Sequence, residues 1–191
     1  MRIILASSSP YRRALLARLQ IPFETIAPEV DESAQIGESP QTLVQRLALE
    51  KARKIAANHI DALVIGSDQV AVYNGTVVGK PLTHERAVAQ LSAASGRTVT
   101  LYTGLALVNA ATGSTQSDVL PYHITFRSLH ARQIENYLRK EQPYHCAGSV
   151  KSEGLGVALI EKFDGDDPST LIGLPLIRLI HMLGNEGVSV I

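Results

Sequence analysis

Two segments of the sequence, near 98–110 and 114–127, alternate apolar and polar residues over most of their length. They flank Ala111-Thr112-Gly113, a short connection that ends in glycine. Alternation with a period of two is typical of a strand with one buried face, and two such runs around a short turn predict a β-hairpin. Strands much longer than the usual 5–6 or so residues twist along their length. The hairpin therefore requires a fold with a long twisted sheet.

Helical patterns and short apolar runs alternate along the rest of the chain. The spacing of apolar residues and the capping signals predict helices near 10–20, 40–59, 83–94, 130–140 and 174–184. The remaining apolar runs predict strands near 2–6, 22–27, 62–73 and 156–163, the third of them interrupted at Gly66-Ser67-Asp68. This mixture indicates a mixed α/β (α+β) fold, a mixed sheet flanked by helices. No composition shift marks a boundary, so we expect residues 1–191 to form a single domain.

Composition excludes several classes of protein. The net charge is zero, with 18 basic and 18 acidic residues, so nothing indicates binding to nucleic acid or to an anionic membrane. A single cysteine, Cys146, rules out an intramolecular disulfide and a multi-cysteine zinc site, and it points to a reducing compartment. The apolar stretches are too short to span a bilayer, and the N-terminus lacks the apolar region of a signal peptide. We therefore expect a soluble cytoplasmic protein with no membrane or nucleic-acid partner.

The first strand ends in a stretch that suits an anion. The run ASSSPYRRALL places three serines, a proline and the pair Arg12-Arg13 where a helix begins. Helix N-termini present unpaired N–H groups, and guanidinium groups add bidentate hydrogen bonds to phosphate. The same residues also make an ordinary strand–turn–helix, with Ser9 as the N-cap and Pro10 at the first helical position.

Two charged residues lie within apolar patterns. Lys51 falls in the middle of the apolar face of the helix at 40–59, where it either extends past its neighbours to solvent or meets an anion. Asp68 follows the apolar run that begins at Leu63, and it is either a turn residue between two short strands or a paired, metal-bound or functional carboxylate.

The charged and polar residues singled out so far suit one kind of ligand when they are taken together. The set consists of Ser7, Arg12, Arg13, Lys51 and Asp68, with Glu32 in a polar loop and Lys80 in a glycine–proline connection. By themselves, Glu32 and Lys80 are also compatible with solvated surface charges. Carboxylates suit a hard cation such as Mg²⁺, and basic groups suit a polyphosphate. The Walker A pattern is absent, which argues against a P-loop enzyme.

Eight motifs in order and spacing resemble the Maf family of nucleoside triphosphate pyrophosphatases, and most closely its YceF-type branch, whose members are taken to hydrolyse 7-methyl-GTP. The motifs are LASSSPYRRALL, PEVDES, LALEKA, GSDQV, GKPL, YTGLAL, AGSVKSEG and IGLPL. The resemblance covers nearly the whole chain. It implies a fold like that of the inosine triphosphate pyrophosphatases, with two lobes around a cleft, and cleavage between the α- and β-phosphates with a divalent metal, Mg²⁺ or Mn²⁺.

The resemblance also implies roles for individual residues. Asp68 would be the proton acceptor, and Glu32 would hold the metal with or without Asp68, which leaves open whether Asp68 acts mainly as base or as ligand. The residues that would contact the triphosphate are Ser7, Arg12, Lys51 and Lys80. The implied partners are a nucleoside triphosphate and, as an option, a second copy of the chain in a homodimer.

Three further positions match the specificity sites of the family: Tyr11, Gln69 and Glu153. The carboxylate of Glu153 could accept both N1–H and N2–H₂ of guanine, and the cationic ring of 7-methylguanine favours the aromatic face of Tyr11. Many members have arginine where this chain has Tyr11, and this departure argues against the branch that prefers pyrimidines. The alternatives are a pyrophosphatase that prefers dTTP or UTP, and a nucleotide-binding regulator of cell division without hydrolysis.

Overall fold

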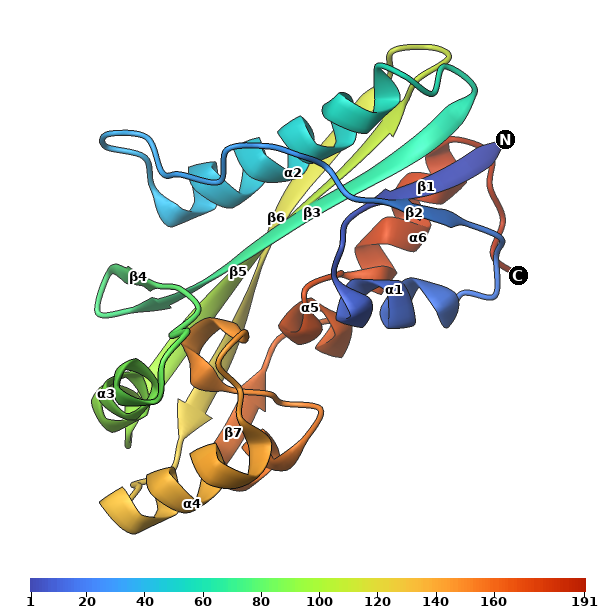
Figure 1. The fold of residues 1–191 in the computed structure, drawn as a ribbon. Coiled ribbons are helices and arrows are strands. Elements are labelled where there is room, and N and C mark those ends of the chain that lie inside the picture. The colour runs from blue at the N-terminus through green and yellow to red at the C-terminus, as the bar shows by residue number, and fades with distance from the viewer. The chain divides into compact units, whose positions relative to one another are not determined.

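A seven-stranded mixed sheet runs through the computed structural model, which describes residues 1–191 (Figure 1). The strands are β1 (Arg2–Ala6), β2 (Glu24–Ile26), β3 (Ala62–Tyr73), β4 (Thr76–Val78), β5 (Thr98–Asn109), β6 (Thr115–Phe126) and β7 (Ile160–Asp164). Their order is β2-β1-β3-β5-β6-β7, with β4 paired to β3. The pairs β1–β2 and β1–β3 are parallel, whereas β3–β4 and β6–β7 are antiparallel. The expected mixed α/β class and the long hairpin are confirmed.

Six α-helices accompany the sheet. They are α1 (Pro10–Ala17), α2 (Pro40–Ala56), α3 (His84–Ala94), α4 (Ala131–Glu141), α5 (Pro168–Ile172) and α6 (Leu176–Asn185), with short 3₁₀ segments at Ala147–Ser149 and Leu155–Leu159. The predicted start signals of α1 and α2 are confirmed, because Ser9 and Ser39 cap the first turns and a proline follows each of them. None of the helices combines the length and the apolar character that a bilayer crossing requires.

Two predictions about strands are wrong. The strand β3 continues without interruption through Gly66, Ser67 and Asp68, because each of these residues has a partner from elsewhere in the chain, as described below. The strand expected at 156–163 begins only at Ile160, since residues Leu155–Leu159 form a 3₁₀ segment that starts at a turn closed on Lys151. The short elements β4 and α5 were not predicted, because three to five residues carry too little periodicity to be recognised.

The chain divides into two compact units. The first comprises Met1–Gln69, Thr103–Leu120 and Asp167–Ile191, and the second comprises Val70–Tyr102 and Pro121–Asp166. In the first unit both faces of the sheet are covered: α1 and α6 pack on one face, and α2 packs on the other (Figure 1). Strands buried on both faces read as continuous apolar runs, as in residues 62–65. In the second unit α3 packs against α4.

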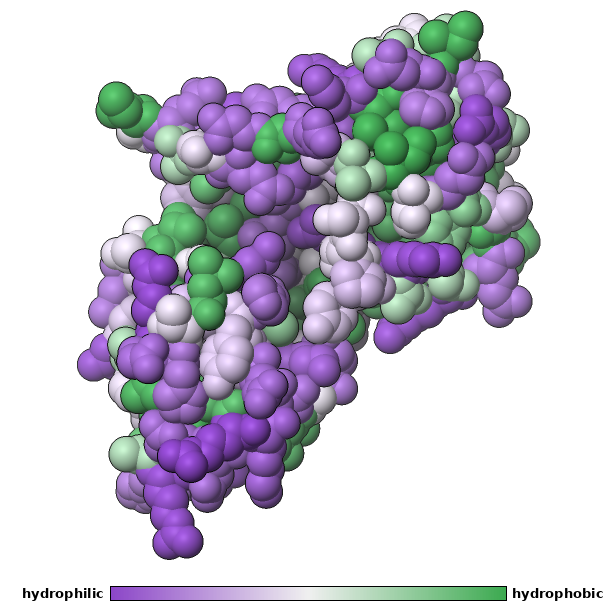
Figure 2. All heavy atoms as spheres, in the orientation of Figure 1, coloured by the Kyte–Doolittle hydropathy of each residue, from purple (hydrophilic) through white to green (hydrophobic).

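Hydrophilic residues cover most of the face shown in Figure 2, including the outward side of α2. The basic residues Arg53 and Lys54 lie in the last turn of this helix, where positive charge complements the helix dipole. The opposite, inward side of α2 is apolar except for Lys51, which is 5% exposed. The helix therefore places one ammonium group inside an otherwise apolar contact with the sheet.

Candidate active site

The first unit has the topology that creates a ligand site in open α/β sheets. From β1 the chain passes through α1 to β2 on one side, and it then returns through α2 to β3 on the other side of β1. The two connecting helices lie on opposite faces, so β1 marks a topological switch point, the place where open α/β sheets bind ligands, and the parallel pairing of β1 with β3 ends there. Ser7 follows the end of β1, and the parallel register pairs Ala6 with Gly66, two residues before Asp68.

An ionic cluster of three residues lies just beyond the point where the parallel pairing of β1 and β3 ends. The Lys51 ammonium is 2.6 Å from Asp68 Oδ1 and 2.6 Å from Glu32 Oε1. The side chain of Asp68 is 11% exposed, whereas that of Glu32 is 59% exposed. A buried charge is costly unless it is paired, and here one ammonium faces two carboxylates. The cluster carries one excess negative charge and is open to solvent at Glu32, so it can accept a further cation.

The position of Lys51 depends on two glycines that let α2 approach the sheet closely. A Cβ atom on Gly66 would lie 2.0 Å from Ala48 O, and one on Gly104 would lie 2.1 Å from Val44 O. No side chain fits at these distances. The glycines therefore let the backbone of α2 lie against β3 and β5. At this distance the side chain of Lys51 reaches Asp68.

The loop that carries Glu32 is held by Arg46, a residue that sequence patterns did not single out. Arg46 Nη2 donates to Ser33 O at 3.0 Å, and Arg46 Nε donates to Glu38 Oε1 at 2.7 Å. This hydrogen bond and charge lower the pKa of Glu38 to about 2. The i,i+4 spacing of Arg46 and Glu50 was a signal for an ion pair on α2, but nothing local indicated the contacts to the loop.

The start of α1 presents polar groups at the same switch point. Ser7 is 7% exposed and its Oγ accepts from Ser9 N at 3.1 Å. The Arg12 guanidinium is largely used within the protein: Nη1 donates to Ser67 O and Nε donates to Gly173 O, each at 2.8 Å. Burial lowers the pKa of Arg12, and the charges of Asp68 and Glu32 partly offset this effect. Arg12 thus ties α1 to β3 and to the end of α5, and Nη2 is the nitrogen that these two bonds leave for a ligand.

The remaining predicted site residues lie in different places. Gln69 follows Asp68 in β3 and points to the opposite face of the strand, where its amide contacts Thr103 and the end of α5. Tyr11 is 38% exposed on α1. Lys80 and Glu153 belong to the second unit and are exposed there. The first unit therefore brings together Glu32, Lys51 and Asp68, with Ser7, Tyr11, Arg12 and Gln69 on the elements around them.

The donor set fits a hard divalent cation that is shared with a polyphosphate. No three His, Cys, Asp or Glu side chains gather into a cluster that would hold a metal alone. Mg²⁺, however, usually takes one or two carboxylates and completes its shell with phosphate oxygens and water. Glu32 and Asp68 supply two carboxylates on the same ammonium group.

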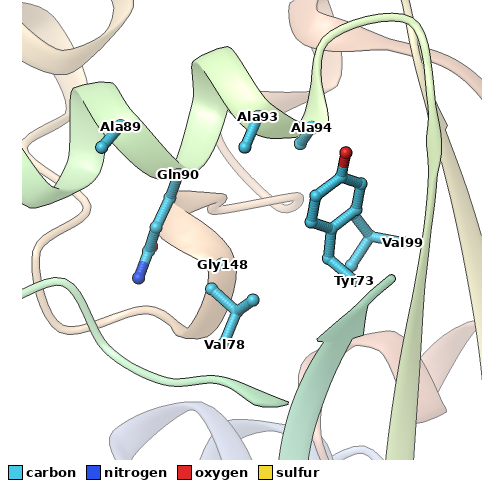
Figure 3. A pocket seen from close by; sticks show the side chains of 8 residues that line it. All are labelled: Tyr73, Val78, Ala89, Gln90, Ala93, Ala94, Val99 and Gly148. Carbon is cyan, nitrogen blue, oxygen red and sulfur yellow. The ribbon is translucent and has the colours of Figure 1, made fainter. Parts of the chain in front are cut away.

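The second unit contains a cavity of about 260 Å³ with a different character (Figure 3). Its walls are almost entirely apolar, and the residues that line it are Tyr73, Val78, Ala89, Gln90, Ala93, Ala94, Val99 and Gly148. Of its two polar side chains, the amide of Gln90 is already bonded to Gly79 O and Ser149 Oγ, and the hydroxyl of Tyr73 is buried without a partner. The cavity thus offers no free charged group to a phosphate.

Comparisons with known proteins found matches that cover nearly the whole chain. A family model described as Maf-like protein matches residues 2–186. A 7-methyl-GTP pyrophosphatase from Methylobacillus flagellatus is 59% identical over 189 residues, which are 99% of this chain and 98% of that protein.

The solved structures that match include two of HAM1 proteins. The one from Coxiella burnetii has a TM-score of 0.45 and 17% identity over 66% of this chain and 73% of its own. The one from Staphylococcus aureus has a TM-score of 0.48 and 14% identity over 66% and 72%. These two structures do not decide the family. The family is shown by the family model that matches residues 2–186 and by the relative that is 59% identical. On these grounds the chain belongs to the Maf family.

Proposed function

We propose that this protein is a nucleoside triphosphate pyrophosphatase that hydrolyses 7-methyl-GTP to 7-methyl-GMP and diphosphate, and so removes a modified nucleotide before it enters nucleic acid. The observation that carries the proposal is the buried Lys51 between Asp68 and Glu32, just beyond the point where the parallel pairing of β1 and β3 ends. The full-length relative with this activity in its name supports the choice of substrate. The single cysteine supports a cytoplasmic location.

In this proposal Asp68 acts as the general base. Its Oδ1 is bonded to Lys51, so Oδ2 takes the proton of a water molecule. The water oxygen forms a bond to the α-phosphorus, the bond from this phosphorus to the bridging oxygen breaks, and diphosphate leaves. Positive charge from Lys51, Arg12 Nη2 and Lys80 stabilises the charge that develops on the diphosphate.

A divalent cation completes the proposed site. Glu32 would hold it, with Asp68 as a second ligand only if Asp68 acts as ligand rather than as base, and phosphate oxygens and water would fill the remaining positions. When bound, Mg²⁺ or Mn²⁺ supplies charge neutralisation on the triphosphate. The excess negative charge of the three-residue cluster favours this second cation beside Lys51.

Selection of the base is assigned to Tyr11, Gln69 and Glu153. Methylation at N7 makes the guanine ring cationic, which favours an aromatic face and a carboxylate over an arginine. The exposed ring of Tyr11 and the exposed carboxylate of Glu153 offer these groups. Replacing Tyr11 by Arg is therefore expected to reduce the preference for 7-methyl-GTP over GTP.

The proposal is tested by diphosphate release from 7-methyl-GTP, GTP, UTP, dTTP and XTP with Mg²⁺ or Mn²⁺, and with a chelator as control. A preference for 7-methyl-GTP is expected. A preference for UTP or dTTP would retain the reaction but refute the assignment of the base.

A second experiment separates catalysis from binding. Asp68→Asn is expected to abolish diphosphate release and to keep nucleotide affinity within about threefold, because the amide cannot take the proton. The matched control is Asp118→Asn, which removes an acidic group that pairs with Arg178. Nucleotide binding without diphosphate release in the wild-type protein would instead support a regulator.

A further inference from the structure

The side-chain amide of Gln69 is held by three acceptors. Its Nε2 donates to Thr170 O at 2.7 Å and to Thr103 Oγ1 at 2.8 Å, and Leu171 O lies at 3.4 Å. Thr103 is fully buried, and its hydroxyl donates in turn to Thr170 O at 3.1 Å. The amide nitrogen and the threonine hydroxyl thus both have partners within the protein.

These contacts allow one orientation of the amide. If the amide were rotated by half a turn, Oε1 would lie where Nε2 now lies, 2.7 Å from another carbonyl oxygen. Two acceptors repel at that distance, so Nε2 points inward and Oε1 points away from Thr170. Oε1 lies beside the backbone of Gly173, 3.6 Å from where a Cβ on that residue would be. Residue 173 itself has no side chain there, and the neighbouring side chain at this point is Arg12, whose Nε and Nη2 lie 3.3 and 3.6 Å from the same position.

We propose that Thr103 is a positioning residue that presents Gln69 to the substrate as a hydrogen-bond acceptor. The inference rests on the proposed function and adds a chemical requirement to it: the nucleoside must offer an N–H or O–H group to Gln69 Oε1. Gln69 could act as donor or acceptor in isolation, and the network removes the donor option. Thr103 acts only through Gln69, because its own hydroxyl is fully buried and bonded.

A double-mutant cycle with Thr103→Val and Gln69→Met tests this dependence. Valine keeps the shape of threonine without the hydroxyl, and methionine keeps the length of glutamine without the amide. For 7-methyl-GTP we expect kcat/KM to fall about tenfold in Gln69→Met and about threefold in Thr103→Val, as for the loss of a neutral hydrogen bond. The double variant is expected to equal Gln69→Met alone, and Thr103→Ser to restore the wild-type value.

The opposite pattern would overturn the inference. A threefold loss from Thr103→Val that persists in the Gln69→Met background would show that Thr103 acts through packing. An unchanged kcat/KM in Gln69→Met would show that Oε1 contacts no substrate group. The same cycle is read as nucleotide Kd by calorimetry, which needs no turnover. If the wild-type protein bound 7-methyl-GTP but did not hydrolyse it, the proposed function would be refuted. The Kd values would still show whether Thr103 acts through Gln69.

Substrate analogues identify the donor. The 2′-deoxy analogue of 7-methyl-GTP lacks one ribose hydroxyl, and 7-methyl-ITP lacks the exocyclic amine. The effect of Gln69→Met is expected to disappear with the analogue that lacks the partner of Oε1. If Gln69→Met still lowers kcat/KM with both analogues, the group that donates to Oε1 is N1–H or the 3′ hydroxyl. If Gln69→Met and the wild-type protein are equally active on every nucleotide, the acceptor role is refuted.

Discussion

Replacing Gly66 by alanine tests how the fold builds the ionic cluster. An added Cβ would lie 2.0 Å from Ala48 O and 2.9 Å from Ala52 N, both in the backbone of α2. Ordinary van der Waals contact begins at 3.4 Å, so the helix and β3 must separate by about 1.4 Å at this point. Backbone atoms of a helix cannot rotate away as a flexible side chain can. The whole segment that carries Lys51 must therefore shift.

The structure sets the expected size of the effect. Lys51 Nζ is 2.6 Å from Asp68 Oδ1. If α2 moves by about 1.4 Å and the Lys51 side chain does not rotate to follow Asp68, the two atoms are no longer within hydrogen-bond distance. Overpacking of a buried contact costs about 1–3 kcal/mol. Displacement of a functional group by about 1 Å can cost about 100-fold in rate. We expect the free energy of unfolding to fall by about 2–3 kcal/mol and kcat/KM to fall by about 100-fold.

Chemical denaturation and diphosphate release measure the two effects separately. The matched control is Gly184→Ala in α6, where an added Cβ has no atom within 4 Å. This control is expected to gain about 0.5 kcal/mol, because alanine has the higher helix propensity, and to keep full activity. If Gly66→Ala had the stability and kcat/KM of the wild-type protein, the close approach of α2 would have no role in building the site.

Three further predictions concern the charged groups. Lys51→Met removes the ammonium group that Asp68 and Glu32 share, and we expect kcat/KM to fall by about 100-fold or more. The control is Lys54→Met, at an exposed position of the same helix, which should keep wild-type kinetics. Because hydrogen bonds from Arg46 and from Gln35 N lower the pKa of Glu38 from 4.5 to about 2, these contacts stabilise the fold above pH 4.5 and the stabilisation is lost as the pH falls toward 2. The difference in urea midpoint between wild type and Glu38→Gln should therefore shrink over that range, and a constant difference would contradict the ion pair. A chelator should stop diphosphate release and Mg²⁺ or Mn²⁺ should restore it. Glu32→Gln should raise the metal concentration for half-maximal activity, and Glu29→Gln should leave it unchanged.

Local patterns in the sequence predicted the elements whose cause is local. The hairpin of β5 and β6 follows from alternation on either side of a short turn, and the starts of α1 and α2 follow from a serine cap before a proline. The apolar face of α2 made Lys51 conspicuous, because a charge within such a face needs an explanation. The resemblance to the Maf family, which the comparisons confirm, also depended on sequence alone.

Sequence patterns were insufficient where a residue owes its state to a distant partner. Gly66 and Asp68 suggested an interruption, yet β3 is continuous, because α2 packs against the glycine and Lys51 neutralises the carboxylate. Arg12 looked like a free phosphate ligand, but two of its nitrogens bind the carbonyl groups of Ser67 and Gly173. A buried donor pairs with an acceptor that lies close to it in the folded protein. Ser67 and Gly173 are separated from Arg12 by 55 and 161 positions in the sequence, so only folding brings them close.

The amino-acid sequence thus determined by itself which residue types are available, where the long strands and capped helices form, and to which family the chain belongs. Only the tertiary structure decided that Lys51 contacts both Asp68 and Glu32, that Arg46 holds the loop carrying Glu32, and that Gln69 presents its oxygen. The physical reason is the range of the interactions. Periodicity and capping act over a few residues, whereas ion pairs and buried hydrogen bonds join residues that only the packing of α2, α5 and the sheet brings together.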